Sequence, residues 1–400
     1  MSHLTPIDHE VEHTSTVPAN YGKKVNLFVR QYEAFGSGGT HKPVLMLHGR
    51  SVPALPGLDV VLPAKGGSPH PDTSLSWAQA LAGKGYDVYV MDLQGSGRSP
   101  RPEMHDPCNA NPAQRSLLKD NPGTADCDPT ANYPHQLGNS KSEWDELGTV
   151  VAFVRERSND EKVSFIGWSA ASFVMGPYAI QHPGDVASLF LLAPMFPPNG
   201  RWSTSSADPF AAPPGTPLPT KPESQPAAVF GFPMNLTSKT ALQAGISDKD
   251  VADAVWQAVL DGDSIGKEWG GSVPGEPEGV MRWRNSYWWG WNDKTAPQGS
   301  VLGGSVPVCI VYGDRDTTAN TPPEMGPLLH FSVPKLYKAV PGGGKLMFRM
   351  EGWDHNPVWE RGAAKVLQHM SWKWLKDKRV YDVKDGSWAI DVDGVLTEVL

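Results

Sequence analysis

Short apolar runs alternate with helix-like segments along most of this chain of 400 residues. The runs that predict strands are Val25–Tyr32, Pro43–Leu47, Asp87–Asp92, Val163–Ile166, Ala187–Ala193, Val306–Tyr312 and Lys345–Met350. The segments that predict helices are Leu75–Gly83, Ser140–Arg157, Ala170–Gln181, a stretch around Pro322–Leu329 and one from Asn356 to about Lys376. This rhythm is typical of a mostly parallel central sheet flanked by helices, which constrains the chain to the α/β class.

Local signals support several of these elements. Ser140 and Glu143 have the spacing of a capping box at a helix start. Ala187–Ala193 is almost wholly apolar, as expected of a parallel strand that is covered on both faces. Val380–Leu400 alternates around Asp393-Gly394, so we expect a C-terminal β-hairpin extension there.

The rhythm stops between about residues 195 and 300. This segment is rich in Pro at first, then has a helical stretch at Asp248–Leu260 and then an aromatic run. It holds Trp202, Trp256, Trp269, Trp283, Trp288, Trp289 and Trp291, nearly half of the 15 Trp in the chain. We therefore expect an inserted lid at 195–300 between two parts of one core, 21–194 and 301–376, with 377–400 as the hairpin extension.

Composition excludes several classes of protein. The net charge is −8 and no Lys/Arg cluster stands out, so nucleic acid is a poor partner. No run of 18 apolar residues predicts a membrane span, and residues 1–20 lack the apolar stretch of a secretory signal. With three cysteines, we expect free thiols in a cytoplasmic protein, and a Cys108–Cys127 bridge is the alternative. The oligomeric state stays open, a homo-oligomer included.

The chemistry centres on Gly167-Trp168-Ser169-Ala170-Ala171, which lies between a predicted strand and a predicted helix. A serine in this setting sits on a sharp turn that raises its hydroxyl above the sheet. The turn brings strand and helix so close that both flanks need small residues, and Gly167 and Ala171 qualify. Ser169 is therefore a candidate nucleophile.

Two later strands each run into a candidate partner of this serine. The strand at 306–312 ends in Gly313-Asp314-Arg315-Asp316, and the strand at 345–350 leads to His355. The order Ser, Asp, His is the order expected for a hydrolase built this way. His355 would take the proton from Ser169 and Asp316 would orient the imidazole, with Asp314 as the second candidate acid.

An earlier loop supplies a candidate oxyanion hole. His48-Gly49-Arg50 follows the strand Pro43–Leu47. Acyl transfer needs two N–H donors aimed at the developing negative charge, and we expect them from the backbone of Arg50 and Ala170. His48 is interpreted as a packing residue that shapes the loop.

Taken together, these motifs resemble the α/β-hydrolase superfamily, of the lid-bearing serine esterase or lactonase type. The pieces are His48-Gly49, Asp92-Leu-Gln-Gly-Ser-Gly-Arg-Ser99, Gly167-Trp-Ser-Ala-Ala171, Gly313-Asp-Arg-Asp316 and Gly352-Trp-Asp-His355. The resemblance implies a catalytic triad of Ser169, Asp316 and His355 and requires no cofactor. Epoxide hydrolases and haloalkane dehalogenases of this superfamily need a carboxylate nucleophile, where this chain has Ser169. The chain departs from the pattern in Ala171, where Gly is usual, and in its long inserts.

The expected substrate pocket lies above Ser169. We expect substrate contacts from Ser51, Trp168, Met195, Trp283, Tyr287, Trp288 and Trp291, with about two of the seven lid Trp touching ligand. Arg282 and Arg284 are interpreted as a solvated face, with a grip on a substrate carboxylate as the alternative. Three Pro-rich stretches, 51–72, 97–134 and 194–226, follow predicted strand ends and are expected to wall the pocket.

The sequence predicts a serine hydrolase that cleaves a carboxylic ester or lactone of a bulky apolar or aromatic small molecule. C–C bond hydrolysis or amidase or peptidase activity by the same triad is one alternative, and a non-catalytic ligand-binding receptor is another. No metal site is predicted, because His9 and His13 lie in a terminal segment that we expect to be exposed.

Overall fold

The structure is a computed structural model that describes residues 4–35, 39–64, 66, 68–118, 127, 137–214, 216, 234–270, 272–273 and 276–399. Ten strands form one sheet in the order β1-β2-β4-β3-β5-β6-β11-β12-β13-β14. Their bounds are β1 Ile7–Thr14, β2 Lys24–Tyr32, β3 Lys42–Leu47, β4 Tyr86–Met91, β5 Val163–Trp168, β6 Val186–Leu192, β11 Val308–Gly313, β12 Lys345–Met350, β13 Gly386–Ile390 and β14 Leu396–Glu398. All pairs from β4 to β13 are parallel, and only the two edges are antiparallel.

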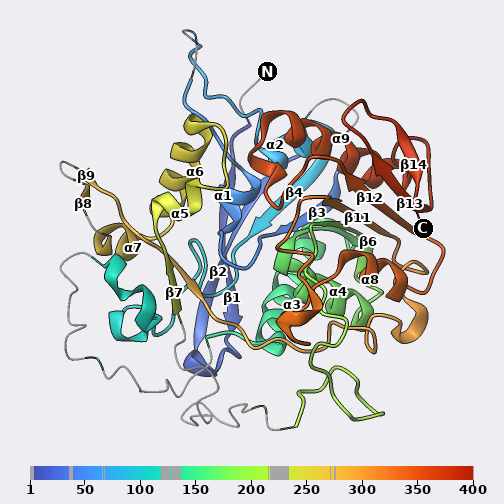
Figure 1. The fold of residues 1–400 in the computed structure, drawn as a ribbon, viewed down its shortest axis with the longest axis horizontal. Helices are drawn as coiled ribbons and strands as arrows, with labels where there is room; N and C mark the ends of the chain where they lie inside the picture. Colours follow the sequence, from blue (N-terminus) through green and yellow to red (C-terminus); the bar gives the residue numbers. More distant parts are fainter. Residues whose placement is uncertain are drawn as a thin grey trace.

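Helices cover both faces of this sheet (Figure 1). The α-helices are α1 Ala54–Leu58, α2 Trp77–Ala82, α3 Ser140–Arg157, α4 Ser172–Gln181, α5 Lys239–Gln243, α6 Lys249–Asp261, α7 Ser264–Trp269, α8 Val333–Ala339 and α9 Arg361–Asp377. Short 3-10 helices lie at Pro18–Asn20, Pro107–Asn109, Pro112–Leu117, Ser169–Ala171, Gln298–Ser300, Pro323–Met325 and Pro357–Trp359. Helices α2 and α9 lie together on one side of the sheet, and α3 and α4 lie together on the other. The predicted α/β class is confirmed.

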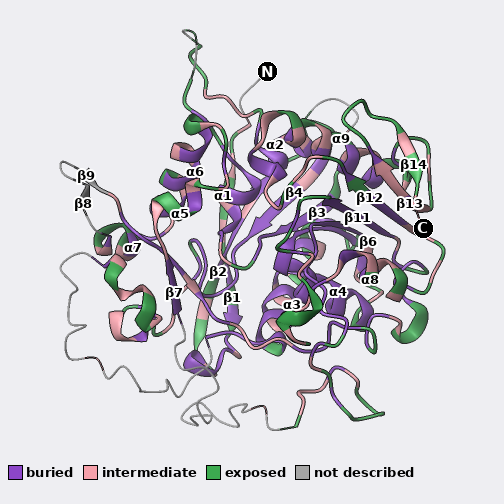
Figure 2. Ribbon diagram, viewed as in Figure 1, coloured by how far each residue is buried: buried purple, intermediate pink, exposed green. Residues whose placement is uncertain are grey.

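The centre of the sheet is the most deeply buried part of the molecule, as the purple strands in Figure 2 show. Every residue of β5 and β11 is buried, and so is nearly all of β3 and β6. Strands covered by helices on both faces need apolar side chains on both sides, which is why these segments have nearly continuous apolar sequences. The opposite holds for β1, where buried and exposed residues alternate along one half of the strand.

Three local expectations differ from the structure. The capping box of α3 is made by Asn139 and Ser142, and Ser140 is already the first helical residue. The helix expected around Pro322–Leu329 is only a 3-10 turn, and the α-helix of this connection comes later, at Val333–Ala339. His13 lies on β1 instead of in an exposed terminus: it is buried and its Nδ1 is 2.7 Å from Thr149 Oγ1. Of the three, only the burial of His13 involves a partner distant in the chain, which local pattern cannot reveal.

Residues 195–300 contain more regular structure than expected. The strands β7 (Met234–Thr237) and β10 (Met281–Arg284) pair antiparallel, and β8 (Ser272–Val273) pairs with β9 (Glu276–Pro277). The helices α5, α6 and α7 lie between β7 and β10 in sequence. Buried residues of α6 such as Val251, Val255 and Val259 belong to the same apolar cluster as the central sheet. The lid boundaries 195–300 stay a prediction.

The second Pro-rich stretch, 97–134, packs against the β7–β10 pair in its described part. Ala110 forms a parallel bridge with Met234, and Leu118 forms an antiparallel bridge with Gly270. Met104, Ala110 and Leu118 join Met234, Leu236 and Val280 in a second, smaller apolar cluster. Residues 119–126 and 128–134 of this stretch, and 215 and 217–226 of the third one, lie outside the described residues.

Cys108 and Cys127 form a disulfide, with their Cα atoms 5.4 Å apart. The expectation of free thiols at these two positions is therefore wrong, and the alternative holds. Cys309 is a free thiol buried in β11. Nothing in the spacing of 19 residues separates a bridged pair from two free thiols, because the bridge depends on how the loop folds back.

Candidate active site

Ser169 sits on the turn that joins β5 to α4. It is buried and has a φ of 57°, which is rare for a residue other than glycine. Ser172 stabilises the turn by donating its hydroxyl to the carbonyl oxygens of Ser169 and Met195, at 2.9 and 2.8 Å. A Cβ at Gly167 would lie 3.0 Å from Met175 Sδ and 3.1 Å from Ala171 Cβ, so the small residues expected here are needed. The serine hydroxyl is thereby held at the carboxyl end of the sheet.

His355 comes to this serine from a distant loop after β12. Its Nε2 lies 2.9 Å from Ser169 Oγ, and its Nδ1 lies 2.9 and 3.0 Å from the two carboxylate oxygens of Asp316. With the proton on Nδ1 donated to Asp316, Nε2 is free to accept the serine hydroxyl. The indole N–H of Trp168 donates to the carbonyl oxygen of His355 at 3.1 Å and helps to position the loop.

Of the two candidate acids, only Asp316 contacts the histidine. Its side chain is fully buried, and one of its oxygens also accepts the backbone N–H groups of Thr318 and Ala319, at 2.9 and 2.8 Å. Asp314 is exposed and accepts the backbone N–H of Gly352 at 2.8 Å. Asp314 therefore positions the loop that carries His355, and it does not act on the imidazole directly.

The loop after β3 runs close to Ser169. A Cβ added at Gly49 would lie 3.3 Å from Ser169 Cβ, which explains the glycine. His48 is buried, and burial lowers its pKa. Its Nδ1 donates to the carbonyl oxygen of Gly49 at 2.6 Å, and its Nε2 accepts the backbone N–H of Leu93 at 3.3 Å. The imidazole thus shapes the loop, as interpreted from the sequence. Arg50 follows directly and is exposed toward the cavity.

A cavity of about 380 Å³ opens above Ser169 and His355. Four other residues expected at the pocket or oxyanion hole line it: Arg50, Ser51, Trp168 and Met195. Trp283 of β10 lines it as well, as expected from the aromatic run. Val52 also lines it, so the start of the Pro-rich stretch 51–72 lies at the pocket as expected. The remaining lining residues were not predicted; they are Gly49, Thr237, Ala241, Leu242, Gly245, Met281, Thr318, Asn356 and Trp359.

Four of the unpredicted lining residues, Thr237, Ala241, Leu242 and Met281, come from β7, α5 and β10. Met281 and Trp283 both line the cavity, while Arg282 between them is on the opposite face of the strand. The alternation Met281-Arg-Trp-Arg was the available signal for a strand with one face toward the pocket. No comparable signal marks Thr237, Ala241 or Leu242, because only the packing of this segment brings them over Ser169.

Three residues expected at the pocket are not among the described residues that line it. Trp291 is buried, with its ring against Gly176 of α4, where an added Cβ would be 2.5 Å away. Trp288 stacks on Phe173, with ring centroids 4.4 Å apart, and donates its indole N–H to Glu143 at 2.8 Å. Tyr287 lies under the guanidinium of Arg201, 4.1 Å from it. These rings fix the segment after β10 against α3 and α4.

Arg282 and Arg284 are buried, so the solvated face expected for them is wrong. Arg282 donates from Nε and Nη2 to the carboxylate of Asp263, at 2.8 and 2.6 Å. Arg284 donates from Nη2 to Glu143 at 2.8 Å. Buried charges need such partners because desolvation is costly. Both arginines anchor β10, and neither reaches the cavity above Ser169.

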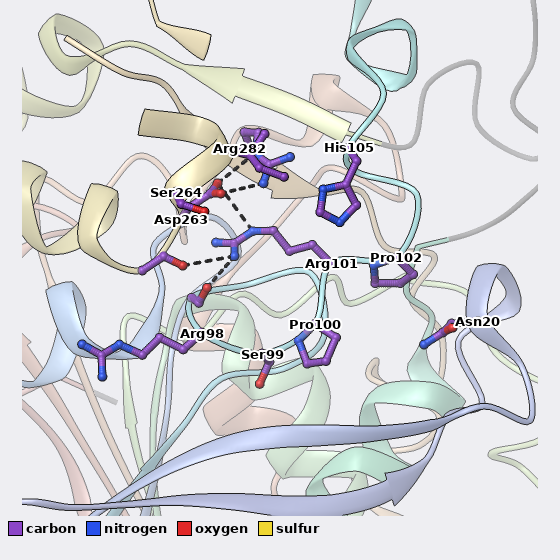
Figure 3. Close-up of a pocket in the computed structure, with 13 residues that line it drawn as sticks. Asn20, Arg98, Ser99, Pro100, Arg101, Pro102, His105, Asp263, Ser264 and Arg282 are labelled. Atoms are coloured by element: carbon purple, nitrogen blue, oxygen red, sulfur yellow. Dashed lines mark hydrogen bonds and ion pairs between the residues drawn. The ribbon is translucent and has the colours of Figure 1, made fainter. Parts of the chain in front are cut away.

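A second cavity, of about 430 Å³, lies on the other face of β10 (Figure 3). Arg101 and Arg282 both direct their guanidinium groups at Asp263 there, with Arg101 Nε 3.6 Å from the carboxylate. Arg101 comes from the second Pro-rich stretch and also donates to the carbonyl oxygens of Gly97 and Gly262. In its described part, this stretch therefore contacts the Arg282 face of β10 and does not line the cavity above Ser169, contrary to expectation.

No group of three or more His, Cys, Asp or Glu side chains that could hold a metal ion occurs in the described part of the chain. Within the same residues, no helix is both long and apolar enough to cross a bilayer. The hydrogen-bonded series Ser169, His355 and Asp316 can carry a proton from the hydroxyl to the imidazole without any further group.

Comparison with known proteins identifies the family to which the chain belongs. The sequence matches the family model described as alpha/beta hydrolase fold over residues 42–360. Among curated proteins, none matches the chain. Solved structures that are similar include an esterase from Thermogutta terrifontis, at 14% identity over 92% of this chain and 98% of that chain, with a TM-score of 0.45.

Two further solved structures are similar in the same way. One is a thioesterase domain from the curacin biosynthetic pathway, at 16% identity over 91% of this chain and 98% of that chain, with a TM-score of 0.45. Another is the N-acyl homoserine lactonase AidH, at 15% identity over 93% and 97% of the two chains, with a TM-score of 0.41. The family model spans most of the chain, and the protein therefore belongs to the α/β-hydrolase fold family.

Proposed function

We propose that this protein is a serine hydrolase that cleaves a carboxylic ester or lactone of a bulky, largely apolar molecule. The observation that carries the proposal is the pair of contacts at His355, with Nε2 2.9 Å from Ser169 Oγ and Nδ1 2.9 Å from Asp316 Oδ2. A serine hydroxyl is a weak nucleophile on its own and becomes effective when an oriented base takes its proton. The cavity above Ser169 offers room and apolar walls for a small-molecule substrate.

The reaction follows from these positions. Ser169 Oγ attacks the ester carbonyl while His355 accepts the hydroxyl proton and Asp316 stabilises the imidazolium. The backbone N–H groups of Arg50 and Ala170 would hold the oxyanion of the tetrahedral intermediate. His355 then protonates the leaving alkoxide, which leaves an acyl group on Ser169. A water molecule, deprotonated by His355, releases the acid and restores the serine.

The described lining supports the substrate class. Trp168, Trp283 and Trp359 line the cavity together with Leu242, Met195 and Met281. Large apolar and aromatic side chains favour a substrate with a large apolar or aromatic body. An acidic side chain that could bind a free amine is missing from the described lining, which favours esters over the amino ends of peptides.

The cytoplasmic location predicted from the sequence stays a prediction, and the Cys108–Cys127 disulfide weighs against it. Stable disulfides are typical of oxidising compartments and rare in the cytosol.

The test is active-site labelling together with turnover. A fluorophosphonate probe should label the wild-type protein, and Ser169→Ala should lose both the label and the hydrolysis of p-nitrophenyl esters. Ser158→Ala is the matched control, because that buried hydroxyl also donates to a backbone carbonyl oxygen, at the end of α3, and does not line the cavity. Labelling of Ser169→Ala, or turnover close to wild type, would contradict the proposal.

A further inference from the structure

Arg50 is an arginine without a counter-ion at the cavity above Ser169. No carboxylate pairs with its guanidinium, and no hydrogen bond to it occurs, in the described part of the chain. Arg101, Arg282 and Arg284 near the lid each have a buried carboxylate partner. Arg201 has none in the described part of the chain, but it donates to the carbonyl oxygen of Trp288 at 3.4 Å and does not line this cavity. Because no carboxylate of the described residues pairs with it, the guanidinium of Arg50 is available to bind a ligand.

The walls around Arg50 hold its side chain in place without neutralising it. Its guanidinium carbon lies 4.7 Å from the ring centroid of Trp283 and 5.9 Å from that of Trp288. Both rings are themselves fixed, since the indole N–H of Trp283 donates to Thr237 at 3.0 Å and that of Trp288 donates to Glu143 at 2.8 Å. An arginine over an aromatic face is attracted to the ring while its N–H edge stays able to bind a planar anion.

The electrostatics of the cavity agree with this geometry. Of the described residues that line it, Arg50 is the only one with a permanent charge, and none is Asp or Glu. The side chain is open to the cavity, but the surrounding walls partly desolvate its guanidinium and lower the pKa of Arg50, and no nearby acid offsets this effect. The protein as a whole carries a net charge of −8, which repels anions at long range. A local cation beside Ser169 therefore marks a specific point of attraction in an otherwise repulsive field.

We propose that Arg50 selects esters or lactones that carry a carboxylate, which its side chain binds while Ser169 attacks the ester carbonyl. This inference rests on the proposed function and narrows its substrate class to an apolar or aromatic body with one anionic group. Arg50 would then have two separate roles. Its backbone N–H would donate to the oxyanion, as in the proposed function, and its side chain would bind a carboxylate elsewhere on the substrate. Binding energy gained at such a remote group orients the reacting carbonyl.

The direct test compares pairs of esters in which one member carries a carboxylate and the other a neutral group at the same place. One pair is 4-acetoxybenzoate and its methyl ester, with the charge on the alcohol side. The other pair is mono-p-nitrophenyl glutarate and p-nitrophenyl pentanoate, with the charge on the acyl side. For at least one pair, wild-type protein should prefer the anionic member in kcat/KM, and Arg50→Met should lower that preference about 10- to 100-fold, mainly through KM.

Arg157→Met is the matched control, because Arg157 also lies over an aromatic ring, at 4.8 Å from Phe153, but on the exposed end of α3. It should leave the preference at the wild-type value. Arg50→Lys should retain part of the preference, since the charge remains and the planar fork is lost. If Arg50 only tied its loop to Trp283, Arg50→Met would slow both members of each pair equally, and that result would overturn the inference.

A binding measurement remains decisive if Arg50→Met does not fold. In Ser169→Ala, calorimetry should detect the anionic member of at least one pair binding more tightly than its neutral partner. Equal or weaker binding of the anionic member in both pairs would refute the role of Arg50. Failure of the Ser169 proposal would show instead as turnover of every ester by Ser169→Ala.

Discussion

The carboxylate of Asp316 lies 2.9 Å from Nδ1 of His355, whereas Asp314, two residues earlier, accepts a hydrogen bond from the backbone N–H of Gly352. One acid therefore orients the imidazole and the other holds the loop that carries it. Both follow the same strand, β11, and only the position of the chain after Gly313 separates their roles.

We expect Asp316→Asn to lower kcat on an activated ester by about a thousandfold or more, because an amide both removes the negative charge and can favour the wrong imidazole tautomer. Asp314→Asn should cost less than about tenfold, since the amide oxygen can still accept the Gly352 N–H. Steady-state kinetics at saturating substrate would measure both. Equal losses in the two variants would contradict the assignment of Asp316.

The ion pair between Asp263 and Arg282 should be a major support of β10. Although burial by itself would raise the pKa of Asp263, the hydrogen bonds from Arg282 and the charges of Arg101 and Arg282 lower it overall. Removing one partner of a buried pair leaves the other charge uncompensated. Asp263→Asn should therefore reduce the free energy of unfolding by about 3–5 kcal/mol in urea titrations.

The control for that experiment is the exposed pair of Lys24 and Glu12, whose side chains are 65% and 66% exposed. Glu12→Gln should change the free energy of unfolding by less than about 1 kcal/mol. A loss of similar size in both variants would show that the Asp263 cluster gains nothing from its burial.

Glu146 makes the stability of the protein depend on pH. It lies buried in α3, accepts two hydrogen bonds from Gln94, and burial raises its pKa to about 7. Between its ordinary pKa of 4.5 and about 7, the folded protein keeps a proton that the unfolded chain has released. The free energy of unfolding should therefore fall as pH rises through this window, by about 3 kcal/mol in total, and level off above it.

Replacement of this carboxyl isolates the effect. The difference in unfolding free energy between Glu146→Gln and wild type should shift in favour of the variant as pH rises from 4.5 to 8. Glu156→Gln, on an exposed position of the same helix, should show no such shift. Denaturant titrations at several pH values give both comparisons, and parallel curves for Glu146→Gln and wild type would disprove the prediction.

The Cys108–Cys127 disulfide should stabilise the second Pro-rich stretch. Closing a loop of about 20 residues is worth about 3 kcal/mol at most, so reduction with dithiothreitol should lower Tm by a few degrees. Thiol alkylation followed by mass spectrometry supplies the control. Cys309 is buried, and burial raises its pKa well above the usual range, so it should react only after unfolding. Alkylation of Cys108 without reduction would contradict the bridge.

Much of the central sheet could be predicted because its signals are local. Strands such as Pro43–Leu47 and Lys345–Met350 are apolar runs bounded by polar turns, and the structure places them within one residue of the expected bounds. The sharp turn at Ser169 was predictable for the same reason, since the small residues at Gly167 and Ala171 are set by contacts within a few residues.

Local pattern did not reveal what distant contacts decide. Glu143 looked like a capping residue of its own helix, and instead its carboxylate binds Arg284 and Trp288, more than 140 residues away. The strand β7 carries few residues and gains its regular structure from pairing with β10. In both cases the energy comes from a partner that sequence spacing does not identify.

The sequence by itself determined the α/β fold class and predicted Ser169, His355 and an acid after Gly313, with Asp316 preferred over Asp314, because strand patterns and turn residues act over short distances. Only the tertiary structure decided which acid contacts the histidine, which face of β10 lines the cavity, and that Arg50 remains without a counter-ion. Those properties depend on burial and on charge pairs formed across the fold. Whether a charged side chain has a partner depends on which residues surround it in the fold. Arg50 is surrounded by Trp283 and the other cavity residues only when β10 is packed over the sheet.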